Sequence, residues 1–388
     1  MRFARHWRRG TVPAALFIVF TSAVLGPAAH GQQSATPHGA AKQLQSTDLK
    51  EWKSIRQSAL SNDGAWFAYV VSPNEGDATL VIRSTAADGK ELKFPIGEIP
   101  SGAGGRGGPP AAPGGEAAST LEISGDSRWV AYTIYPAASA GRGAARGGRQ
   151  GAPAQSTGAP PARNKVGLVN LASGEKKEFD KIRRFAFNGD KPTWIAMQSY
   201  SDAPADTSAA GRGGRGAAGA ASTRPEGTDL ILYRLASGEA VNVGNVAEFG
   251  FDDAGEWLAY TIDARDEIGN GIQLRNMRTD VVRAIDSDRA LYRHLVWADS
   301  GRGITVLRGR ADSTVRDTLY SVVAFTNLSA QTPKKTVFDP AQHSDFSSAM
   351  KIAADRAPRL SEDLSSIFFG IREAKKPATE RSQAAAAR

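Results

Sequence analysis

The sequence predicts an all-β fold, a β-propeller of four-stranded antiparallel blades with about five blades and part of a sixth. Three observations predict it. A turn followed by an apolar strand recurs six times, four of the seven tryptophans occupy one column of this repeat, and a second alternating strand follows most copies. The four tryptophans are spaced by 63, 65 and 63 residues, which leaves about 36 to 45 residues per unit once long insertions are set aside.

Each copy begins with Asp, Asn, Ser or Gly residues, which tolerate left-handed backbone and connect antiparallel strands tightly. The strand that follows is aromatic or β-branched except for a small alanine at its centre, as suits a strand buried on both faces. Four copies are clear and the last two are degenerate. The six copies are residues 61–69, 124–132, 188–196, 252–260, 298–306 and 361–369.

The second strand is apolar and alternating, and in several copies a Gly- or Asp-containing turn and a polar outer strand follow it. Helical periodicity is nearly absent, with short candidates only at 48–56 and 347–355. An irregular β-sandwich with coincidental turns is the alternative, and the aligned turns and tryptophans favour the propeller over it. The second strands are expected at 80–83, 166–175, 230–239, 272–275 and 319–323, with outer strands at 90–94 and 240–243.

The first 31 residues have the order of regions of a secretory signal peptide. Four arginines precede an apolar run at 11–26, and Ala29 and Gly31 suit cleavage before Gln32. A twin-arginine route and an uncleaved anchor are the alternatives. Since no later run approaches the length of a membrane span, we expect an exported protein, periplasmic or secreted, that is not held in a membrane after cleavage.

Three Gly/Ala/Pro-rich insertions, at 101–118, 137–163 and 203–225, are expected to be disordered, as are an N-terminal segment at 32–47 and a tail at 375–388. The insertions and the first ten residues hold 12 arginines and two acidic residues, so the remaining chain has 36 basic and 38 acidic residues. The net charge of +8 therefore does not describe the expected propeller, which spans 48–374. Because the Arg-Gly segments lack aromatic residues for base stacking, we expect no nucleic-acid partner.

Residues 49–69 resemble the start of secreted bacterial prolyl oligopeptidase family serine peptidases. The resemblance extends over about 48–374 and implies a non-catalytic propeller of seven or eight blades, which gates peptide entry to a separate α/β-hydrolase domain. No Gly-x-Ser-x-Gly motif, which would carry the nucleophile of such a domain, occurs in the 388 residues. The resemblance therefore implies a module without its hydrolase domain, inactive as this chain, with peptides or that domain as partners. Since the periplasmic Tol-system propeller shares the repeat, a stand-alone exported propeller for binding or scaffolding is the alternative.

Few residues suggest chemistry, and the sequence assigns no catalytic, cofactor-binding or metal-binding residue. The absence of cysteine excludes disulfides, thiol nucleophiles and Cys-based metal sites. His343 with Asp339 and Asp345 could hold a metal but is better explained as a polar loop, and His294 as a strand-edge residue rather than a general base. Asp286, Ser287 and Asp288 are interpreted as a turn rather than a calcium loop. The charged residues considered for the axial channel are Glu248, Asp263, Arg265, Asp266 and Arg293.

Overall fold

The computed structural model describes residues 45–100, 119–137, 162–201, 227–311 and 318–374. These ranges belong to the compact unit Ser46–Arg388, apart from Gln45, which belongs to the unit Met1–Gln45. The expected signal peptide, the insertions at 101–118 and 203–225, most of that at 137–163, and the tail lie outside the described residues. Just over half of the described residues lie in β-strands, and the helical elements among them are one α-helix, α1 (Ser46–Glu51), and one 3₁₀ turn, η2 (Pro340–Gln342).

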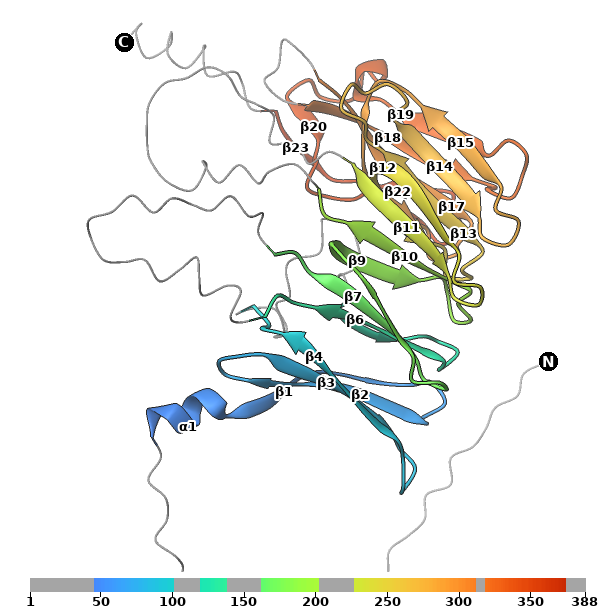
Figure 1. Cartoon of the computed structure of the whole chain (residues 1–388). Helices are drawn as coiled ribbons and strands as arrows, with labels where there is room; N and C mark the ends of the chain where they lie inside the picture. Colours follow the sequence, from blue (N-terminus) through green and yellow to red (C-terminus); the bar gives the residue numbers. More distant parts are fainter. Residues whose placement is uncertain (1–44, 101–118, 138–161, 202–226, 312–317, 375–388) are drawn as a thin grey trace, which may run out of the picture. The chain divides into compact units, whose positions relative to one another are not determined.

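Three sheets are four-stranded and antiparallel, with their strands side by side in chain order (Figure 1). This order, with each sheet following the last along the chain, is that of propeller blades. Blade 1 comprises β1 (Lys53–Leu60), β2 (Trp66–Pro73), β3 (Ala78–Ser84) and β4 (Glu91–Gly97). Blade 2 comprises β5 (Leu121–Ile123), β6 (Trp129–Ile134), β7 (Lys165–Asn170) and β8 (Lys176–Phe179). Blade 5 comprises β16 (Leu291–Trp297), β17 (Gly303–Ala311), β18 (Thr318–Thr326) and β19 (Lys334–Phe338).

Blades 3 and 4 share one strand and therefore form a seven-stranded sheet. The shared strand is β12 (Ala240–Phe251), whose first half pairs with β11 and whose second half pairs with β13. Val246 is paired on both sides, with Thr228 and with Ile262. Blade 3 also contains β9 (Ile182–Phe187), β10 (Trp194–Ser199) and β11 (Thr228–Arg234). Blade 4 continues with β13 (Trp257–Ile262), β14 (Gly271–Asn276) and β15 (Val282–Ser287).

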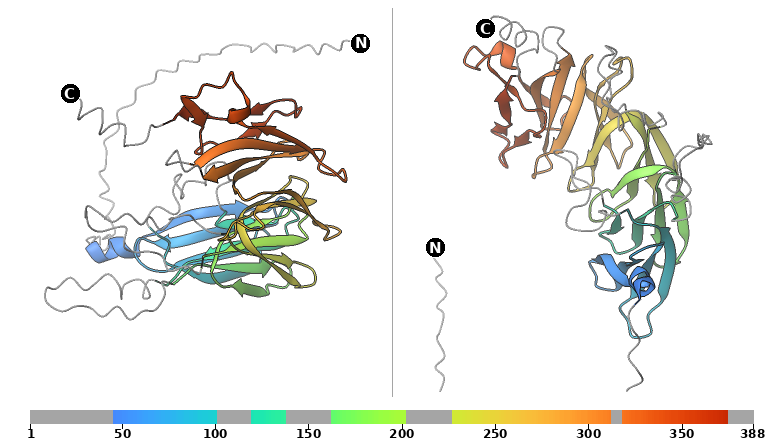
Figure 2. Two further views of the ribbon diagram at one scale, coloured as in Figure 1. Left: turned by 90° about the horizontal axis from the view of Figure 1, so that it is seen from above. Right: turned by 90° about the vertical axis from the view of Figure 1, so that its left-hand side faces the viewer.

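A partial sixth blade follows blade 5, seen in red in Figure 2. It consists of two small sheets, in which β20 (Met350–Ile352) pairs with β23 (Ile371–Glu373) and β21 (Arg359–Leu360) pairs with β22 (Ile367–Phe368). The helix expected at 347–355 is wrong, because Met350–Ile352 pair with β23. The helix expected at 48–56 ends at Glu51, since the residues from Lys53 onward pair with β2 instead.

The first residue of the recurring turn has a side chain that accepts a hydrogen bond across the turn and so closes it. A side-chain oxygen at this position accepts from the backbone N–H of the tryptophan that begins the second strand. This holds for Ser61, Ser124, Asn188 and Asp252, at 2.7–2.9 Å. Serine, asparagine and aspartate are interchangeable here because each offers an acceptor on a short side chain.

Alternate residues of the second strand face opposite neighbours. In β10, Ile195 and Met197 pack in one cluster with residues of blade 2, whereas Trp194 and Ala196 pack with residues of blade 4. The alanine at the strand centre is fully buried in the first four blades, at Ala68, Ala131, Ala196 and Ala259. The predicted small residue therefore lies where two sheets pack face to face.

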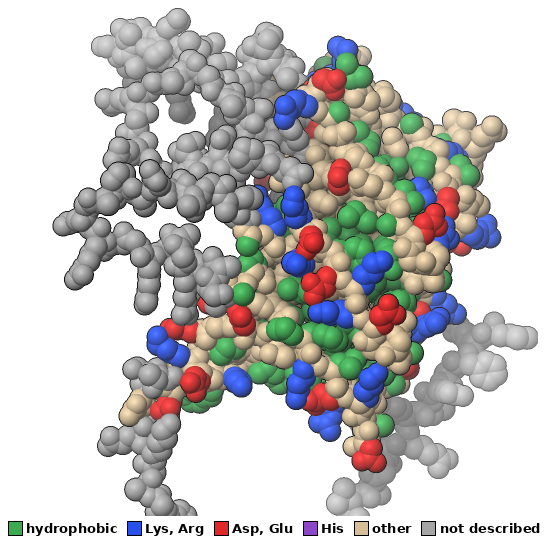
Figure 3. Space-filling view, viewed as in Figure 1, with side chains coloured by type: hydrophobic (Ala, Val, Ile, Leu, Met, Phe, Trp, Pro, Cys, Tyr) green, Lys and Arg blue, Asp and Glu red, His purple; other side chains and the backbone are tan. Residues whose placement is uncertain are grey.

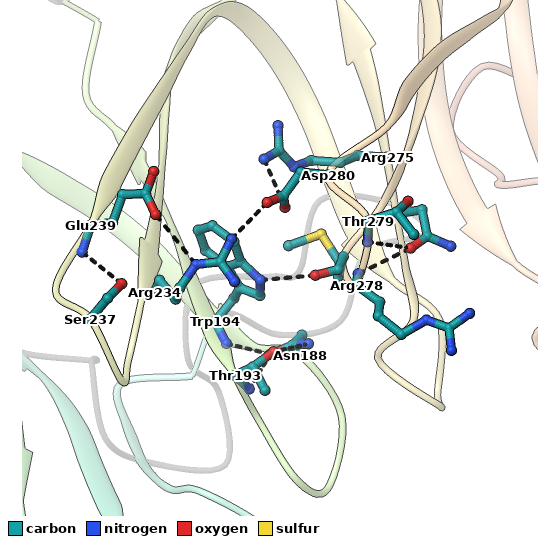
Figure 4. A network of polar contacts seen from close by, with 12 residues as sticks. Asn188, Thr193, Trp194, Arg234, Ser237, Glu239, Arg275, Arg278, Thr279 and Asp280 are labelled. Atoms are coloured by element: carbon teal, nitrogen blue, oxygen red, sulfur yellow. Dashed lines mark hydrogen bonds and ion pairs between the residues drawn. The ribbon is translucent and has the colours of Figure 1, made fainter.

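Trp194 joins blades 3 and 4 at the centre of a polar network (Figure 4). Its indole is fully buried, and Nε1 donates to the backbone oxygen of Met277 at 3.1 Å. The guanidinium of Arg234 lies over the ring at 4.1 Å from its centroid and donates to Asp280 at 2.6 Å. Arg275 donates to the other oxygen of Asp280 at 3.1 Å. Two arginines of neighbouring blades thus share one carboxylate beside a buried aromatic ring.

Asp252 makes the stability of the fold depend on pH. Burial raises the pKa of its carboxyl above the ordinary value of 3.8. The folded state therefore favours the neutral acid. The contribution of this carboxyl to the stability of the fold is fully present below pH 3.8 and is lost as the pH rises through the raised pKa. We expect Asp252→Asn, which keeps the acceptor as Asn188 does, to raise the urea midpoint at pH 7. The gain should disappear near pH 3.

Asp63 provides a control of opposite sign. Hydrogen bonds from Ser61 and Ala65 lower the pKa of its exposed carboxyl. Its contribution is therefore present at neutral pH and is lost on acidification through the lowered pKa. Asp63→Asn should lower the midpoint at pH 7, and an equal response of the two variants would contradict the assignment.

Candidate functional site

The first strand of four blades contains a β-bulge away from the recurring turn that follows the strand. One residue is left unpaired in β1, β9 and β12, namely Arg56, Arg183 and Ala247. In β16 two residues, His294 and Leu295, occupy the bulge, and His294 has a φ of 59°. Because bulges redirect side chains and are frequent beside functional sites, these positions are where the blades can present groups to a ligand.

The bulge in β9 places two adjacent arginines on different surfaces. Arg184 reaches blade 4, where its guanidinium lies 4.0 Å from the ring centroid of Phe249 and donates to the backbone oxygen of that residue at 2.6 Å. Arg183 is exposed and donates to Oε1 of the fully buried Gln198 at 2.9 Å. Gln198 in turn donates to the backbone oxygens of Val246 and Ala247. The exposed guanidinium is therefore held by a side chain that is itself fixed.

Burial controls the electrostatics of this site. It lowers the pKa of Arg184 to about 10, with the charge of Arg183 acting in the same direction and that of Glu248 opposing it. Desolvation of its guanidinium also lowers the pKa of Arg183, although the residue as a whole is exposed, and Tyr200 and Glu248 oppose this effect. The guanidinium of Arg163 lies 5.0 Å from the ring centroid of Tyr200, whose pKa burial raises. We call Arg163, Arg183, Arg184, Tyr200 and Glu248 the inner-strand arginine cluster.

The inner-strand arginine cluster can bind an anion. It contains three guanidinium groups and one carboxylate, and that carboxylate accepts a hydrogen bond from the backbone N–H of Leu295 at 2.8 Å. An anion beside the exposed guanidinium of Arg183 would favour the charged form of this group, whose pKa the surroundings lower. A planar carboxylate matches the paired N–H donors of a guanidinium. On the face shown in Figure 3, acidic and basic side chains are interspersed.

The structure brings only one of the five charged residues considered for the channel into this cluster, Glu248. Asp263 is buried beyond the end of β13, where its backbone N–H donates to Asn245 and its carboxylate accepts from Asn270 at 3.3 Å. Asp266 accepts from Ile268 in the following loop, to which Arg265 also belongs. Arg293 lies in β16 and is paired with Leu307.

His294 and His343, the two histidines within the described residues, lie in structural contacts. His294 was expected at a strand edge but is buried at the bulge within β16, with Nε2 2.6 Å from the backbone oxygen of Ala354. His343 stacks on Phe338, with ring centroids 4.6 Å apart, and Asp339 accepts from Ala341 at the start of η2. No group of three potential metal-binding side chains occurs among the described residues.

The turn expected at 286–288 is wrong for its first two residues, which are the end of β15. Asp286 accepts from Lys335 at 2.6 Å and from the hydroxyl of Tyr292 at 3.1 Å. Asp288 pairs with Arg310. These carboxylates connect blade 4 to blade 5.

Sequence reasoning missed Arg183 and Arg184, although a signal was present. They form a charged pair inside a short strand, Ile182–Phe187, whose other four residues are apolar. Adjacent side chains of a regular strand point to opposite faces, so two adjacent arginines in an apolar strand indicate a bulge or an internal charge.

No family model and no curated protein matches the sequence. Solved structures that resemble it include a prolyl endopeptidase at 14% identity and a TM-score of 0.37, over 79% of this chain and 38% of that chain. Others are TolB from Acinetobacter baumannii (10%, 0.30, 73% of this chain and 56% of that chain) and the β-propeller domain of the Trilobed protease from Pyrococcus furiosus (9%, 0.35, 83% and 80%). This chain thus spans about two fifths of the prolyl endopeptidase and little more than half of TolB. The strand order and register of the blades identify the chain as a β-propeller module.

Proposed function

We propose that this chain is a non-catalytic β-propeller module that binds peptides through the inner-strand arginine cluster. In a longer prolyl oligopeptidase-like enzyme it would cover the active site and control the entry of peptides. We further propose that the protein is exported, as its first 31 residues suggest. In the described part of the chain, no helix has the length and apolar character needed to cross a bilayer.

The observation that carries this proposal is the placement of Arg183. It is the unpaired residue of a bulge, exposed, and anchored by a hydrogen bond to the buried Gln198. A peptide brings a carboxylate at its C-terminus or on an acidic side chain, and either suits the guanidinium. The resemblance of residues 49–69 to peptidase propellers supports a peptide as the ligand. The absence of Gly-x-Ser-x-Gly from the sequence supports a role without catalysis.

The test compares two peptides of one sequence, one with a free C-terminal carboxylate and one amidated, by calorimetric titration. Hydrogen bonds to charged groups contribute about 1.5–3 kcal/mol, so we expect the free acid to bind about tenfold more tightly or better. Arg183→Gln should remove this difference, whereas Arg183→Lys should keep part of it. The matched control is Arg302→Gln. Arg302 is exposed and lies in the recurring turn of blade 5, away from the bulge in that blade's first strand, so its replacement should leave the affinities for both peptides unchanged.

Two outcomes would contradict the proposal. Equal binding of both peptides by the wild-type chain would exclude recognition of the carboxylate by the cluster. Covalent labelling by a fluorophosphonate probe, or turnover of a chromogenic prolyl peptide, would show that the chain is itself a serine hydrolase. The probe is applied to the same preparation used for titration.

A further inference from the structure

Tyr200 lies near Arg183, at the place where blade 2 meets blade 3. The backbone N–H of Tyr200, just beyond β10, donates to the backbone oxygen of Lys181 at 2.9 Å. The backbone N–H of Ile182 donates to the backbone oxygen of Asn164, which precedes β7 of blade 2, at 3.0 Å. One segment of each blade is therefore bonded to the two residues that lead to the bulge. The neighbouring positions of β7, β9 and β10 can be followed in Figure 1.

Two side chains of blade 2 hold the ring of Tyr200. The guanidinium of Arg163 lies 5.0 Å from the ring centroid, a distance at which a cation is attracted to the face of the ring. The side chain of Asn164 forms a hydrogen bond with the hydroxyl. Because Tyr200 is only half-buried, the ring is held in place while part of it stays accessible to a ligand.

The hydroxyl of Tyr200 has a proton to donate. Burial raises the pKa of this hydroxyl, and the charges of Arg163 and Arg183 and the hydrogen bond with Asn164 oppose the rise. The phenol is therefore protonated at neutral pH. A hydrogen bond that lowers the pKa of a phenol is one in which the phenol oxygen accepts, so here the amide of Asn164 donates. The proton of the hydroxyl itself then remains for another acceptor.

We propose that the hydroxyl of Tyr200 donates a second hydrogen bond to the ligand carboxylate that Arg183 binds. This inference rests on the proposed function of the inner-strand arginine cluster and adds a residue that determines its specificity. A carboxylate has two acceptor oxygens, so it can accept from a guanidinium and from a hydroxyl at once. A primary amide has one acceptor oxygen, and its NH₂ group cannot accept from the second donor. Tyr200 therefore helps to select an acid over the corresponding amide.

Both donors are held in place from neighbouring blades. Gln198 accepts from Arg183 at 2.9 Å and donates to the backbone oxygen of Val246 in β12, at the junction with blade 4. Tyr200 is held from the other neighbour, blade 2, by Arg163 and Asn164. Donors that are fixed beforehand lose less conformational entropy when a ligand binds. The bond to Gln198 uses one of the five N–H donors of the guanidinium, which leaves others for the carboxylate.

Calorimetric titration with N-acetyl-tetraalanine, as the free acid and as the C-terminal amide, tests this role. The C-terminal carboxylate is the one ionisable group of this peptide, so a difference between the two forms reports on that group. We expect Tyr200→Phe, which keeps the ring beside Arg163, to lower the ratio of acid to amide affinity about fivefold, the usual net effect of one hydrogen bond. The affinity for the amide should not change. The matched control, Tyr320→Phe, removes a hydroxyl from a half-buried ring of blade 5 and should leave the ratio unchanged.

A double-mutant cycle shows whether the two donors contact the same carboxylate. Arg183→Gln is combined with Tyr200→Phe, and the ratio of acid to amide affinity is measured for all four proteins. Tyr200→Phe should have little further effect in the Arg183→Gln background, because the carboxylate is no longer held beside the hydroxyl. Fully additive losses would overturn the shared contact.

The results distinguish this inference from the proposed function. Equal binding of both peptides by the wild-type chain, or binding of neither, would contradict the proposed function itself. A wild-type preference for the acid that Tyr200→Phe leaves unchanged would overturn only the role of Tyr200. An equal loss of affinity for both peptides would also overturn it, since it would show that the hydroxyl supports the structure and does not recognise the carboxylate. The melting temperature of each variant identifies a folding failure separately.

Discussion

Replacing Trp194 by alanine is expected to lower the free energy of unfolding by about 3–5 kcal/mol, the range for truncating a large buried aromatic side chain. Trp194 has no exposed surface and contacts both blades 3 and 4. Its loss would leave a cavity beneath Arg234 and remove the donor to Met277. Asp280 could still accept hydrogen bonds from Arg234 and Arg275, but both guanidinium groups would lose their contact with the indole ring.

Urea denaturation followed by circular dichroism measures this effect. The matched control is Trp66→Ala, which changes the same position of the repeat in blade 1, where the indole is only partly buried. We expect less than half the loss for the control. Equal losses of unfolding free energy in both variants would show that burial of Trp194 between blades 3 and 4 adds no more stability than the partly buried Trp66 does.

Replacing Gly255 by alanine is expected to be comparably damaging, by about 3 kcal/mol or more, for a different reason. Gly255 has a φ of 68°, and an added Cβ would lie 2.4 Å from the backbone oxygen of Asn188 in the turn of the preceding blade. The left-handed backbone alone costs a residue with a Cβ about 1–2 kcal/mol. The rest of the loss comes from forcing two turns apart, because backbone atoms cannot rotate away.

Gly64→Ala separates the two contributions. Gly64 occupies the same position of the turn in blade 1 with a φ of 71°, and an added Cβ there would meet no atom within 4 Å. We expect only the backbone cost, visible as a smaller fall of the melting temperature. Ser127, which occupies this position in blade 2 with a φ of 59°, already shows that a side chain fits where space allows. A similar fall in both glycine variants would refute the turn-to-turn contact.

Much of the blade architecture could be predicted because its determinants are local. The acceptor at Ser61 or Asn188, the left-handed residue that follows and the alanine at the strand centre each have one physical cause within a short segment. The helix expected at 48–56 ends early, at Glu51, because Lys53 pairs with Pro73, which lies outside that segment. Pairing between distant residues overrides the propensity of a short peptide.

The shared strand could not be predicted for a similar reason. The outer strand is predicted at 240–243, and Asn245, just beyond it, has a left-handed φ of 59°. The ladder nevertheless continues, since Val246 pairs on both sides. The arginine cluster likewise depends on bulges, which are defined by the partner strand and not by the strand itself.

β12 also bears on how such a chain can be rearranged. A repeat can be duplicated, deleted or exchanged most simply where the backbone leaves one sheet before it enters the next, as between Phe179 and Ile182. No such break exists within Ala240–Phe251, where a cut would divide a continuous hydrogen-bonded ladder. We therefore expect that shuffled or permuted versions of this propeller fold only when blades 3 and 4 are kept together.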